Sequence, residues 1–352
     1  MTPDPRSEPC LTPAESRVSV GDRVVLRFRD ADGSLTDALG DLVGLDESTA
    51  VVRTRRGDVR VPRAAVVAAK RVPPPPSRRG RPHRAISATD LQELMVGGMP
   101  PLESQWLGRW LLRAADGYTG RGNSALPLGD PGLDVEAALD QVEQWYADRE
   151  QPALVQVFGP VGFEVAEDPL GAAVLARGWQ TMPRTLVMTA ATDDVALALA
   201  QVPDDPTARV AEAVDARWIS GATPREQQHE TTLTAMLGQV RDGRHVTLGA
   251  AEVPDAVGRL AVSPGWAGVF AVHVQERLRR QGLARRVLAA LVREAQRADA
   301  GSLYLQVTAD NEPGVALYRS LGFTVHHDYV YAHPAPQAGR AAPQAGRVAA
   351  RR

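Results

Sequence analysis

Arg279-Arg280-Gln281-Gly282-Leu283-Ala284 separates two segments of different periodicity and decides the fold. The apolar run from Val269 to Val274 precedes it and predicts a buried strand. After it, apolar residues recur at helical spacing on one face: Leu283, Val287, Leu288, Leu291, Val292 and Ala295. The order is therefore strand, tight basic turn, helix. The first-turn N–H groups and the dipole of such a helix suit a phosphate or pyrophosphate, and Gly282 lets the backbone approach that ligand closely.

This hexapeptide resembles the acyl-CoA loop of the GNAT superfamily of N-acetyltransferases. The loop pattern is Arg or Gln, two residues, Gly, one residue, then Gly or Ala, and Arg279, Gly282 and Ala284 occupy the defining positions. About thirty residues on, a second signature of the superfamily is matched: an Asn, a short helix carrying Leu-Tyr, then Leu-Gly-Phe and a final strand. It reads Asp310-Asn311-Glu312-Pro313-Gly314-Val315-Ala316-Leu317-Tyr318-Arg319-Ser320-Leu321-Gly322-Phe323. The resemblance covers roughly residues 205–333.

The composition is that of an ordinary globular protein, with 352 residues and 44% hydrophobic residues, and predicts two or three domains. No run approaches the roughly 18 apolar residues of a membrane span, and the N-terminus has no apolar signal core. We therefore expect a cytoplasmic protein without a membrane partner. The single cysteine, Cys10, excludes an internal disulfide, and the seven histidines lack ligand spacing, so no metal site is expected.

The net charge of -2 conceals an uneven distribution. Between Arg53 and Arg84, eleven Arg or Lys residues accompany a single acid, Asp58. From Ala85 to Ala200 there are six basic and sixteen acidic residues, and from Arg277 to the end there are twelve and five. The basic N-terminal part predicts an acidic partner or a nucleic acid.

The N-terminal part is predicted to be a small all-β domain. Residues 1–16 are Pro-rich and polar and are expected to be disordered. Short β patterns alternate with turn signals over residues 17–71, which predicts a barrel of the Src-homology (SH3-like) or Tudor-like shape. Such barrels usually bind peptides or nucleic acid, and a packing module with a solvated basic edge is the alternative. Residues 72–84 form a Pro/Arg-rich linker, and the basic tail at 334–352 is expected to be disordered.

Residues 85–200 are predicted to form a second globular region. Helices are expected at Ile86–Leu94 and Ser104–Arg113, and Trp106 and Trp110 would then share one helix face. Core packing is the role expected for this pair, with an aromatic substrate wall as the alternative. A strand is expected from Ala153 to Phe158.

The end of this region resembles the end of the next. Residues 173–179 can be aligned with residues 317–323. In this alignment Val174 takes the position of Tyr318, and no basic loop precedes the first segment. We therefore expect a degenerate GNAT-like half that has lost its cofactor site or that completes the fold of the other half. The layout resembles actinobacterial acetyltransferases with a small N-terminal barrel, some of them histone-acetyltransferase-like, and tandem-domain enzymes such as mycothiol synthase.

Residues 201–333 are expected to adopt the mixed α/β GNAT acyl-CoA N-acyltransferase fold. Thr223, Pro224 and Glu226 predict the start of its opening helix. The resemblance implies acetyl-CoA as acyl donor, with the backbones of Val272 and Val274 on the pantetheine amides and an oxyanion-type N–H nearby. The residues implied for the pyrophosphate are Arg279, Arg280, Gln281, Gly282, Leu283 and Ala284.

Two further residues carry roles implied by the resemblance. Tyr318 would be the general acid for the departing thiolate, and its alternative is a core tyrosine. Asn311 would contact the cofactor, and its alternative is a helix N-cap. The general base stays open among His273, Glu276 and Glu252, because His273 faces either the cleft or the solvent.

The resemblance implies an N-acetyltransferase in which a primary amine of a protein or small molecule attacks the thioester directly. The acceptor stays open among a protein lysine, a protein N-terminus, an antibiotic amine and a metabolite. The alternative function is that of a nucleic-acid-associated or regulatory protein that binds acetyl-CoA with weak or no catalysis.

Overall fold

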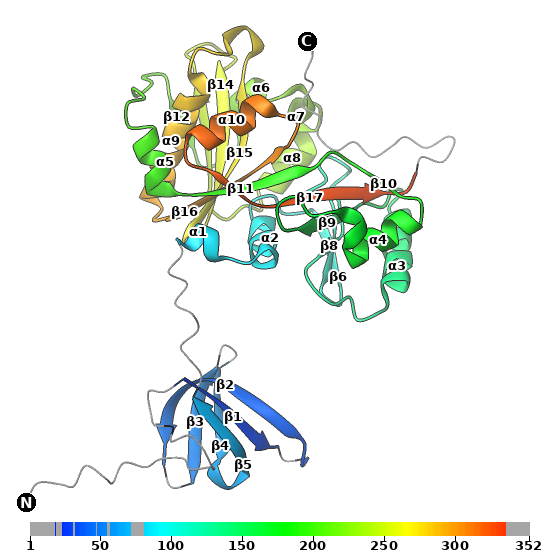
Figure 1. The fold of residues 1–352 in the computed structure, drawn as a ribbon. Coiled ribbons are helices and arrows are strands. Elements are labelled where there is room, and N and C mark those ends of the chain that lie inside the picture. The colour runs from blue at the N-terminus through cyan, green and yellow to red at the C-terminus, as the bar shows by residue number, and fades with distance from the viewer. Residues whose placement is uncertain are drawn as a thin grey trace, which may run out of the picture. The chain divides into compact units, whose positions relative to one another are not determined.

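The chain divides into two compact units, residues 1–79 and 80–352 (Figure 1). The computed structural model describes residues 18, 23–30, 32–46, 48–54, 57–71 and 81–335. The segment expected to be disordered at residues 1–16 lies outside these, as do residues 72–80 of the expected linker and residues 336–352 of the tail.

The first unit is an antiparallel sheet whose described strands follow the order β4-β3-β2-β1-β5. Fully buried residues alternate along the strands, as Val24, Leu26 and Val52 illustrate, because successive side chains of a strand point to opposite faces. The expected small all-β domain is confirmed. Its elements are β1 (Arg23–Arg29), β2 (Leu35–Leu45), β3 (Thr49–Thr54), β4 (Gly57–Pro62), the 3-10 helix η1 (Arg63–Ala65) and β5 (Val66–Arg71).

The second unit is built on a sheet of nine described strands, in the order β10-β17-β11-β16-β15-β14-β13-β12, with β9 paired to β17 off this path. Within it only β15 and β16 pair in parallel. The strands are β9 (Val155–Gly159), β10 (Gln180–Thr181), β11 (Thr185–Ala191), β12 (Arg209–Ala211), β13 (Gly243–Leu248), β14 (Ala256–Ser263), β15 (Trp266–Val274), β16 (Ser302–Thr308) and β17 (Thr324–His333).

Helices cover both faces of this sheet. On one face, α5 (Thr192–Ala198), α9 (Leu283–Arg297) and α10 (Glu312–Ser320) pack against a core that includes Leu260 and Leu305; we call it the α9 face. On the other, α2 (Ala88–Val96), α6 (Ala216–Gly221) and α8 (Glu230–Leu237) pack against a core that includes Phe270 and Tyr304; we call it the α2 face. None of the described helices is both long and apolar enough to cross a bilayer.

Residues 85–200 and 201–333 exchange strands. β11, from the first region, lies between β16 and β17 of the second. In return, the last part of β17 pairs with β9 and β10 of the first region (Figure 1). Each region therefore supplies a central strand to the other. Of the two alternatives for the GNAT-like half, the structure supports the one in which it completes the fold of its neighbour.

The helix expected at Ser104–Arg113 is wrong. The segment is a hairpin of β6 (Glu103–Leu107) and β7 (Trp110–Ala114), with β8 (Leu126–Pro127) beside β7. Gly108 turns the chain at a φ of +53°, which few other residues adopt readily. Trp110 is 3% exposed in a core with α3 (Val135–Ala147), whereas Trp106 is 49% exposed, so the two do not share one buried face.

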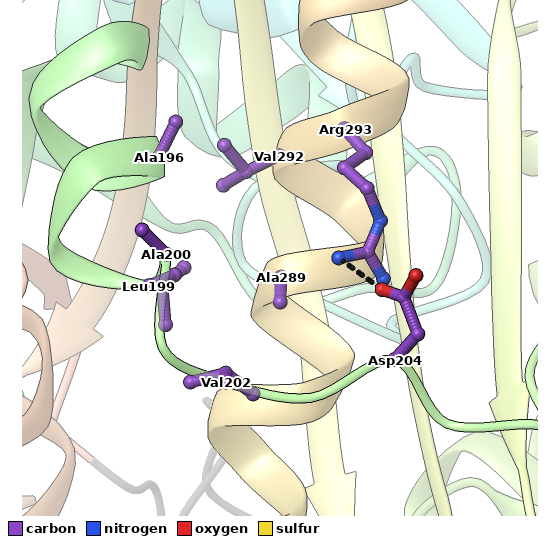
Figure 2. Close-up of a pocket in the computed structure, with 8 residues that line it drawn as sticks. All are labelled: Ala196, Leu199, Ala200, Val202, Asp204, Ala289, Val292 and Arg293. Carbon is purple, nitrogen blue, oxygen red and sulfur yellow. Dashed lines mark ion pairs between the residues drawn. The ribbon is translucent and has the colours of Figure 1, made fainter.

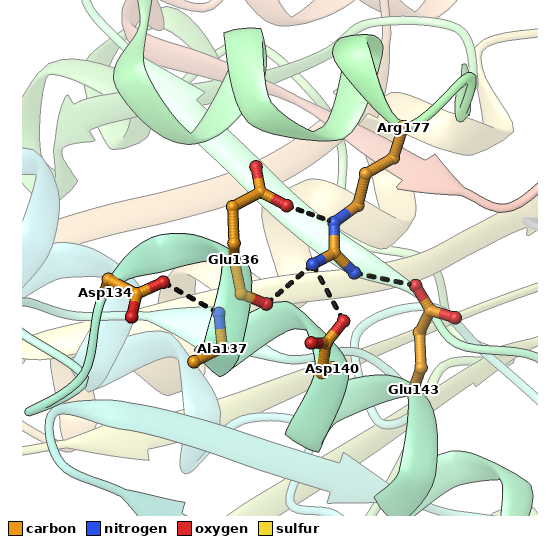
Figure 3. Close-up of polar contacts among 6 residues, drawn as sticks. All are labelled: Asp134, Glu136, Ala137, Asp140, Glu143 and Arg177. Atoms are coloured by element: carbon orange, nitrogen blue, oxygen red, sulfur yellow. Dashed lines mark hydrogen bonds and ion pairs between the residues drawn. The ribbon is translucent and has the colours of Figure 1, made fainter.

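One arginine ties α3 to α4 (Pro169–Ala176) in this region (Figure 3). Arg177, at the end of α4, forms ion pairs with three carboxylates of α3 at 2.7–3.1 Å: Glu136, Asp140 and Glu143. Asp134 caps the same helix by accepting a hydrogen bond from the Ala137 N–H. Three carboxylates on one face of a helix, over successive turns, would repel one another without this guanidinium, so the contact is structural.

A pocket of about 340 Å³ lies between α5 and α9 on the α9 face (Figure 2). Small apolar side chains line it, and an ion pair of Arg293 with Asp204 at 2.9 Å closes one end. Its α9 residues, from Ala289 to Arg293, lie in the middle of the helix. The pocket is therefore separate from the basic turn that precedes α9.

Candidate functional site

The candidate site begins where two neighbouring strands separate. β15 and β16 pair in parallel only from Trp266–Val269 opposite Ser302–Leu305. Beyond this point β15 stays paired with β14 as far as Val274. A register shift in the β14–β15 ladder coincides with Ala271, whose φ is +49°. After Val269, the edge of β15 that faces β16 consequently has no strand partner among the described residues. The backbone groups on this edge are available to a ligand.

The side chains of the β15 residues after Val269, from Ala271 to Val274, alternate between the two faces of the sheet. The half-buried side chains of Val272 and Val274 pack on the α9 face, so it is their backbone that a ligand in the gap could reach. Ala271 packs on the α2 face, and the alternation of a strand places His273 there too. His273 therefore points away from α9 and toward the helices that cover the α2 face.

The basic turn folds as the sequence predicts. After the 3-10 helix η3 (Glu276–Leu278), Arg280 has a φ of +61° and Gly282 a φ of +82°, and α9 starts at Leu283. A Cβ added at Gly282 would meet no heavy atom within 4 Å, so the space beside it is open. The first turn of α9 has neither a side-chain cap nor an acidic residue. Its free N–H groups fit a pyrophosphate.

The arginines of this turn differ in what they contact. Arg279 is exposed, 4.0 Å from Glu276, and Arg280 and Gln281 are exposed as well. By contrast, Arg285 donates a hydrogen bond to the Ser320 hydroxyl of α10 at 2.7 Å, and Arg286 forms an ion pair with Asp205 at 3.3 Å. Two arginines of α9 thus fix the helix start, and the turn itself presents exposed cationic side chains.

Asn311 and Tyr318 lie on α10, on the α9 face. Asn311 is the N-cap of α10 and accepts a hydrogen bond from the Gly314 N–H at 3.1 Å. Tyr318 is half-buried, with its ring 5.9 Å from that of Phe323, and burial raises the pKa of its hydroxyl to about 12. This hydroxyl has no hydrogen-bond partner among the described residues. It is therefore a neutral donor whose proton is free for a ligand.

Among the candidate bases, the structure distinguishes His273. Burial lowers its pKa, which keeps the imidazole neutral and able to accept a proton, while the charge of Glu226 opposes this shift. Glu252 and Glu276 are both exposed. Glu226 lies in α7 (Pro224–Gln228) and accepts hydrogen bonds from the backbone N–H and hydroxyl of Thr223, each 2.8 Å long.

The capping box at the start of α7 is the one predicted, but no local sequence pattern indicates that Glu226 lies near His273. These two residues belong to segments far apart in the chain. Only the packing of α7 over the α2 face brings them together.

Two protein families match nearly the whole described chain. The family "Probable histone acetyltransferase Rv0428c C-terminal" matches residues 89–332, and "Rv0428c N-terminal Sm-like domain" matches residues 18–70. The "Probable histone acetyltransferase Rv0428c" of Mycobacterium tuberculosis (strain ATCC 25618 / H37Rv) is 34% identical over 142 residues. These residues are 38% of this chain and 43% of that protein, so the match spans less than half of the relative's length.

Solved structures share the fold of the second unit. A "GCN5-related N-acetyltransferase from Kribbella flavida" is similar with a TM-score of 0.52 and 19% identity, over 72% of this chain and 97% of its own. A "functionally unknown conserved protein from Staphylococcus epidermidis ATCC 12228" is similar with a TM-score of 0.50 and 9% identity, over 69% and 98%. At these identities the likeness shows the GNAT fold.

The match at residues 18–70 corrects one expectation, because the small N-terminal domain is Sm-like rather than SH3-like. Both folds are small antiparallel sheets of short strands, and the spacing of β patterns and turns does not separate them. The C-terminal match covers more than half of the sequence. The chain therefore belongs to the family of the probable histone acetyltransferase Rv0428c, a GNAT-type acetyltransferase family that carries an N-terminal Sm-like domain.

Proposed function

We propose that this chain is an acetyl-CoA-dependent N-acetyltransferase in which a primary amine attacks the thioester directly. The observation that carries the proposal is the continuous path from the free edge of β15 to the uncapped start of α9. That path offers unpartnered backbone groups, then the cationic turn, then free helical N–H groups, in the order that a pantetheine arm and a pyrophosphate require.

Bound acetyl-CoA would supply an acetyl group activated as a thioester. The turn from Arg279 to Ala284 would hold the pyrophosphate, and the backbones of Val272 and Val274 would align the pantetheine arm. An N–H of the free β15 edge would donate to the carbonyl oxygen as negative charge develops there. Asn311, which caps the start of α10, would contact the cofactor there.

His273, with Glu226 behind it, would take the proton from the amine. The amine nitrogen then bonds to the carbonyl carbon, the C–S bond breaks, and the sulfur leaves with the electron pair. Tyr318 would donate its proton to a hydrogen bond with that sulfur. An ordinary thiol has a pKa of about 8.5, far below the value of about 12 at Tyr318, so this donor stabilises the thiolate more than it protonates it.

The experiment is a paired measurement on the wild type and Tyr318→Phe. Steady-state thiol release with a panel of amines and peptides should fall by about 10²-fold, the lower end for general acid catalysis. The melting temperature should hardly change, because the Tyr318 hydroxyl contacts no described partner. Full activity in the variant would refute the role of Tyr318, and a large melting shift would favour a core tyrosine.

For the first unit we propose binding to a polyanion or an acidic partner, motivated by the basic excess between Arg53 and Arg84, most of which lies in this unit. If the full chain releases no thiol with any amine but binds acetyl-CoA, a regulatory acetyl-CoA-binding protein becomes the better assignment.

A further inference from the structure

A small cavity lies on the α2 face, at the junction of the two strand-exchanging regions. α2, β7 and β9 line it from the first region and β16 from the second. Its volume of about 10 Å³ is room for about one water-sized group. The side chains that matter here are Arg113 of β7, Arg121 of the following loop, Gln156 of β9 and Gln306 of β16.

Arg113 is a buried cation without a counter-charge. It is 4% exposed and forms no ion pair with a described residue. Its guanidinium donates to the carbonyl oxygen of Ser124 at 3.0 Å, to the Ser124 hydroxyl at 2.7 Å and to Gln156 Oε1 at 3.3 Å. These acceptors are all neutral. A buried charge that is not compensated is costly, so this site favours an anion.

Arg121 adds a second positive charge to the same cavity. It is half-buried and forms no hydrogen bond or ion pair with any residue that the structure describes. Its guanidinium lies 5.9 Å from the centre of the Phe270 ring, and the guanidinium of Arg259 lies 4.0 Å from the same ring. Arg259 is 1% exposed and donates to the carbonyl oxygen of Gly98 at 2.7 Å. Arg121 and Arg259 thus lie against one ring, and the charge of Arg121, after burial, lowers the pKa of Arg259.

Gln156 supplies an independent observation, because it is a buried donor in the cavity without a partner. It is 2% exposed, and its Oε1 accepts from Arg113, which fixes its amide nitrogen as the other atom. That nitrogen has no hydrogen-bond partner. This nitrogen can donate a hydrogen bond, which is what an anionic oxygen accepts.

The cavity also lies beside the gap between β15 and β16. Gln306 directly follows Leu305, the last residue of that parallel pair. It is two residues from Tyr304 and therefore shares the α2 face with it. A group held in the cavity would sit next to the place where the thioester is expected, on the face that carries His273.

We propose that Arg113, Arg121 and Gln156 bind a carboxylate of the acceptor, so that the substrate is a small amine bearing a carboxylate. The proposal rests on the proposed acetyltransferase activity. With room for about one water-sized group, the cavity would take one oxygen of the carboxylate, with the rest of the acceptor outside it. The carboxylate would fix the distance at which the amine meets the thioester.

The test compares amines that differ only in this charge. Thiol release is measured for ω-amino acids from glycine to 6-aminohexanoate, each beside its primary amide, with rates expressed per unprotonated amine. Arg121→Gln is the main variant, because Arg121 holds no described residue in place. Arg109→Gln is its matched control, since Arg109 also lies over an aromatic ring, that of Trp106 at 5.5 Å, but outside the cavity.

In the wild type and in Arg109→Gln, the kcat/KM of one ω-amino acid should be about ten- to a hundredfold higher than that of its primary amide. This is the range for a hydrogen bond to a charged group. Arg121→Gln should remove this preference. Gln156→Glu should do the same and raise the melting temperature, because the new carboxylate would pair with Arg113. Equal rates for acids and amides, or a preference that survives in Arg121→Gln, would overturn the proposal.

A measurement that needs no catalysis distinguishes failure of the carboxylate site from failure of the proposed acetyltransferase function. Acetate, unlike acetamide at the same ionic strength, should raise the melting temperature of the wild type but not of Arg121→Gln. If no amine releases thiol yet acetate has this effect, the anion site stands and the acetyltransferase assignment falls. If thiol is released and acetate has no such effect, the anion site falls and the assignment stands.

Discussion

Acidification below pH 6.5 should destabilise the second unit, because burial keeps adjacent histidines of β17 neutral and their hydrogen bonds leave no place for a further proton. His326 Nε2 lies 2.9 Å from the carbonyl oxygen of Ile86 and must donate to it. Its Nδ1 is then an acceptor, so His327 Nδ1, 2.8 Å away, must donate. His327 Nε2 accepts in turn from the amide nitrogen of Gln92 at 2.9 Å. A proton added to this chain of bonds would place two donors face to face.

The size of the effect follows from the pKa of His327. Burial, together with the charge of His326, lowers it to about 3, against about 6.5 in an unfolded chain. Stability is therefore fully present above pH 6.5 and is lost as the pH falls toward 3, since the unfolded state binds the proton first. At about 1.4 kcal/mol for each pH unit, the loss from His327 between pH 7 and pH 5 is about 2 kcal/mol.

Urea denaturation followed by tryptophan fluorescence measures this effect, because all six tryptophans lie in the second unit. The wild type should lose about 2 kcal/mol more between pH 7 and pH 5 than His327→Gln does. His245, with a pKa lowered to about 4 by burial, contributes equally to both proteins and cancels. His229→Gln serves as the mutational control. If the free energy of unfolding falls equally with pH in the wild type and in His327→Gln, the assignment of a neutral, hydrogen-bonded His327 is refuted.

Two further predictions concern surfaces. Arg177→Met should lower the stability of the second unit by about 1 kcal/mol or more, whereas Arg297→Met, which removes one exposed ion pair with Glu294, should cost less; equal costs for the two would contradict the role of the three-carboxylate contact. The full chain should bind DNA or RNA with an affinity that falls steeply with salt, and a truncation of residues 1–79 should lose this binding but keep acetyl-CoA binding. Salt-insensitive or absent binding would favour a packing role for the first unit.

The elements near the basic turn could be predicted because their signals are local. The apolar run of β15, Gly282 with its positive φ and the periodic face of α9 all follow from residues within one short stretch. The same holds for the capping box at Thr223, which the structure confirms. In such segments backbone preference and packing agree, so the sequence is a sufficient guide.

The elements that could not be predicted depend on contacts between distant segments. A spacing of four between Trp106 and Trp110 suits a helix, but the turn at Gly108 and the pairing of β6 with β7 outweigh it. The insertion of β11 between β16 and β17 leaves no local trace. Nor does the approach of Arg113, Arg121 and Gln156, which three separate elements bring to one cavity.

The central claim is that acetyl-CoA binds at the turn before α9, and calorimetric titration of Gly282→Trp tests it most directly. Gly265→Trp is the matched control, since Gly265 also has a positive φ, +74°, and open space around it, but lies in the turn before β15. Both substitutions should cost similar stability. Acetyl-CoA should bind the wild type and Gly265→Trp alike and fail to bind folded Gly282→Trp. Unchanged affinity in folded Gly282→Trp would contradict the account.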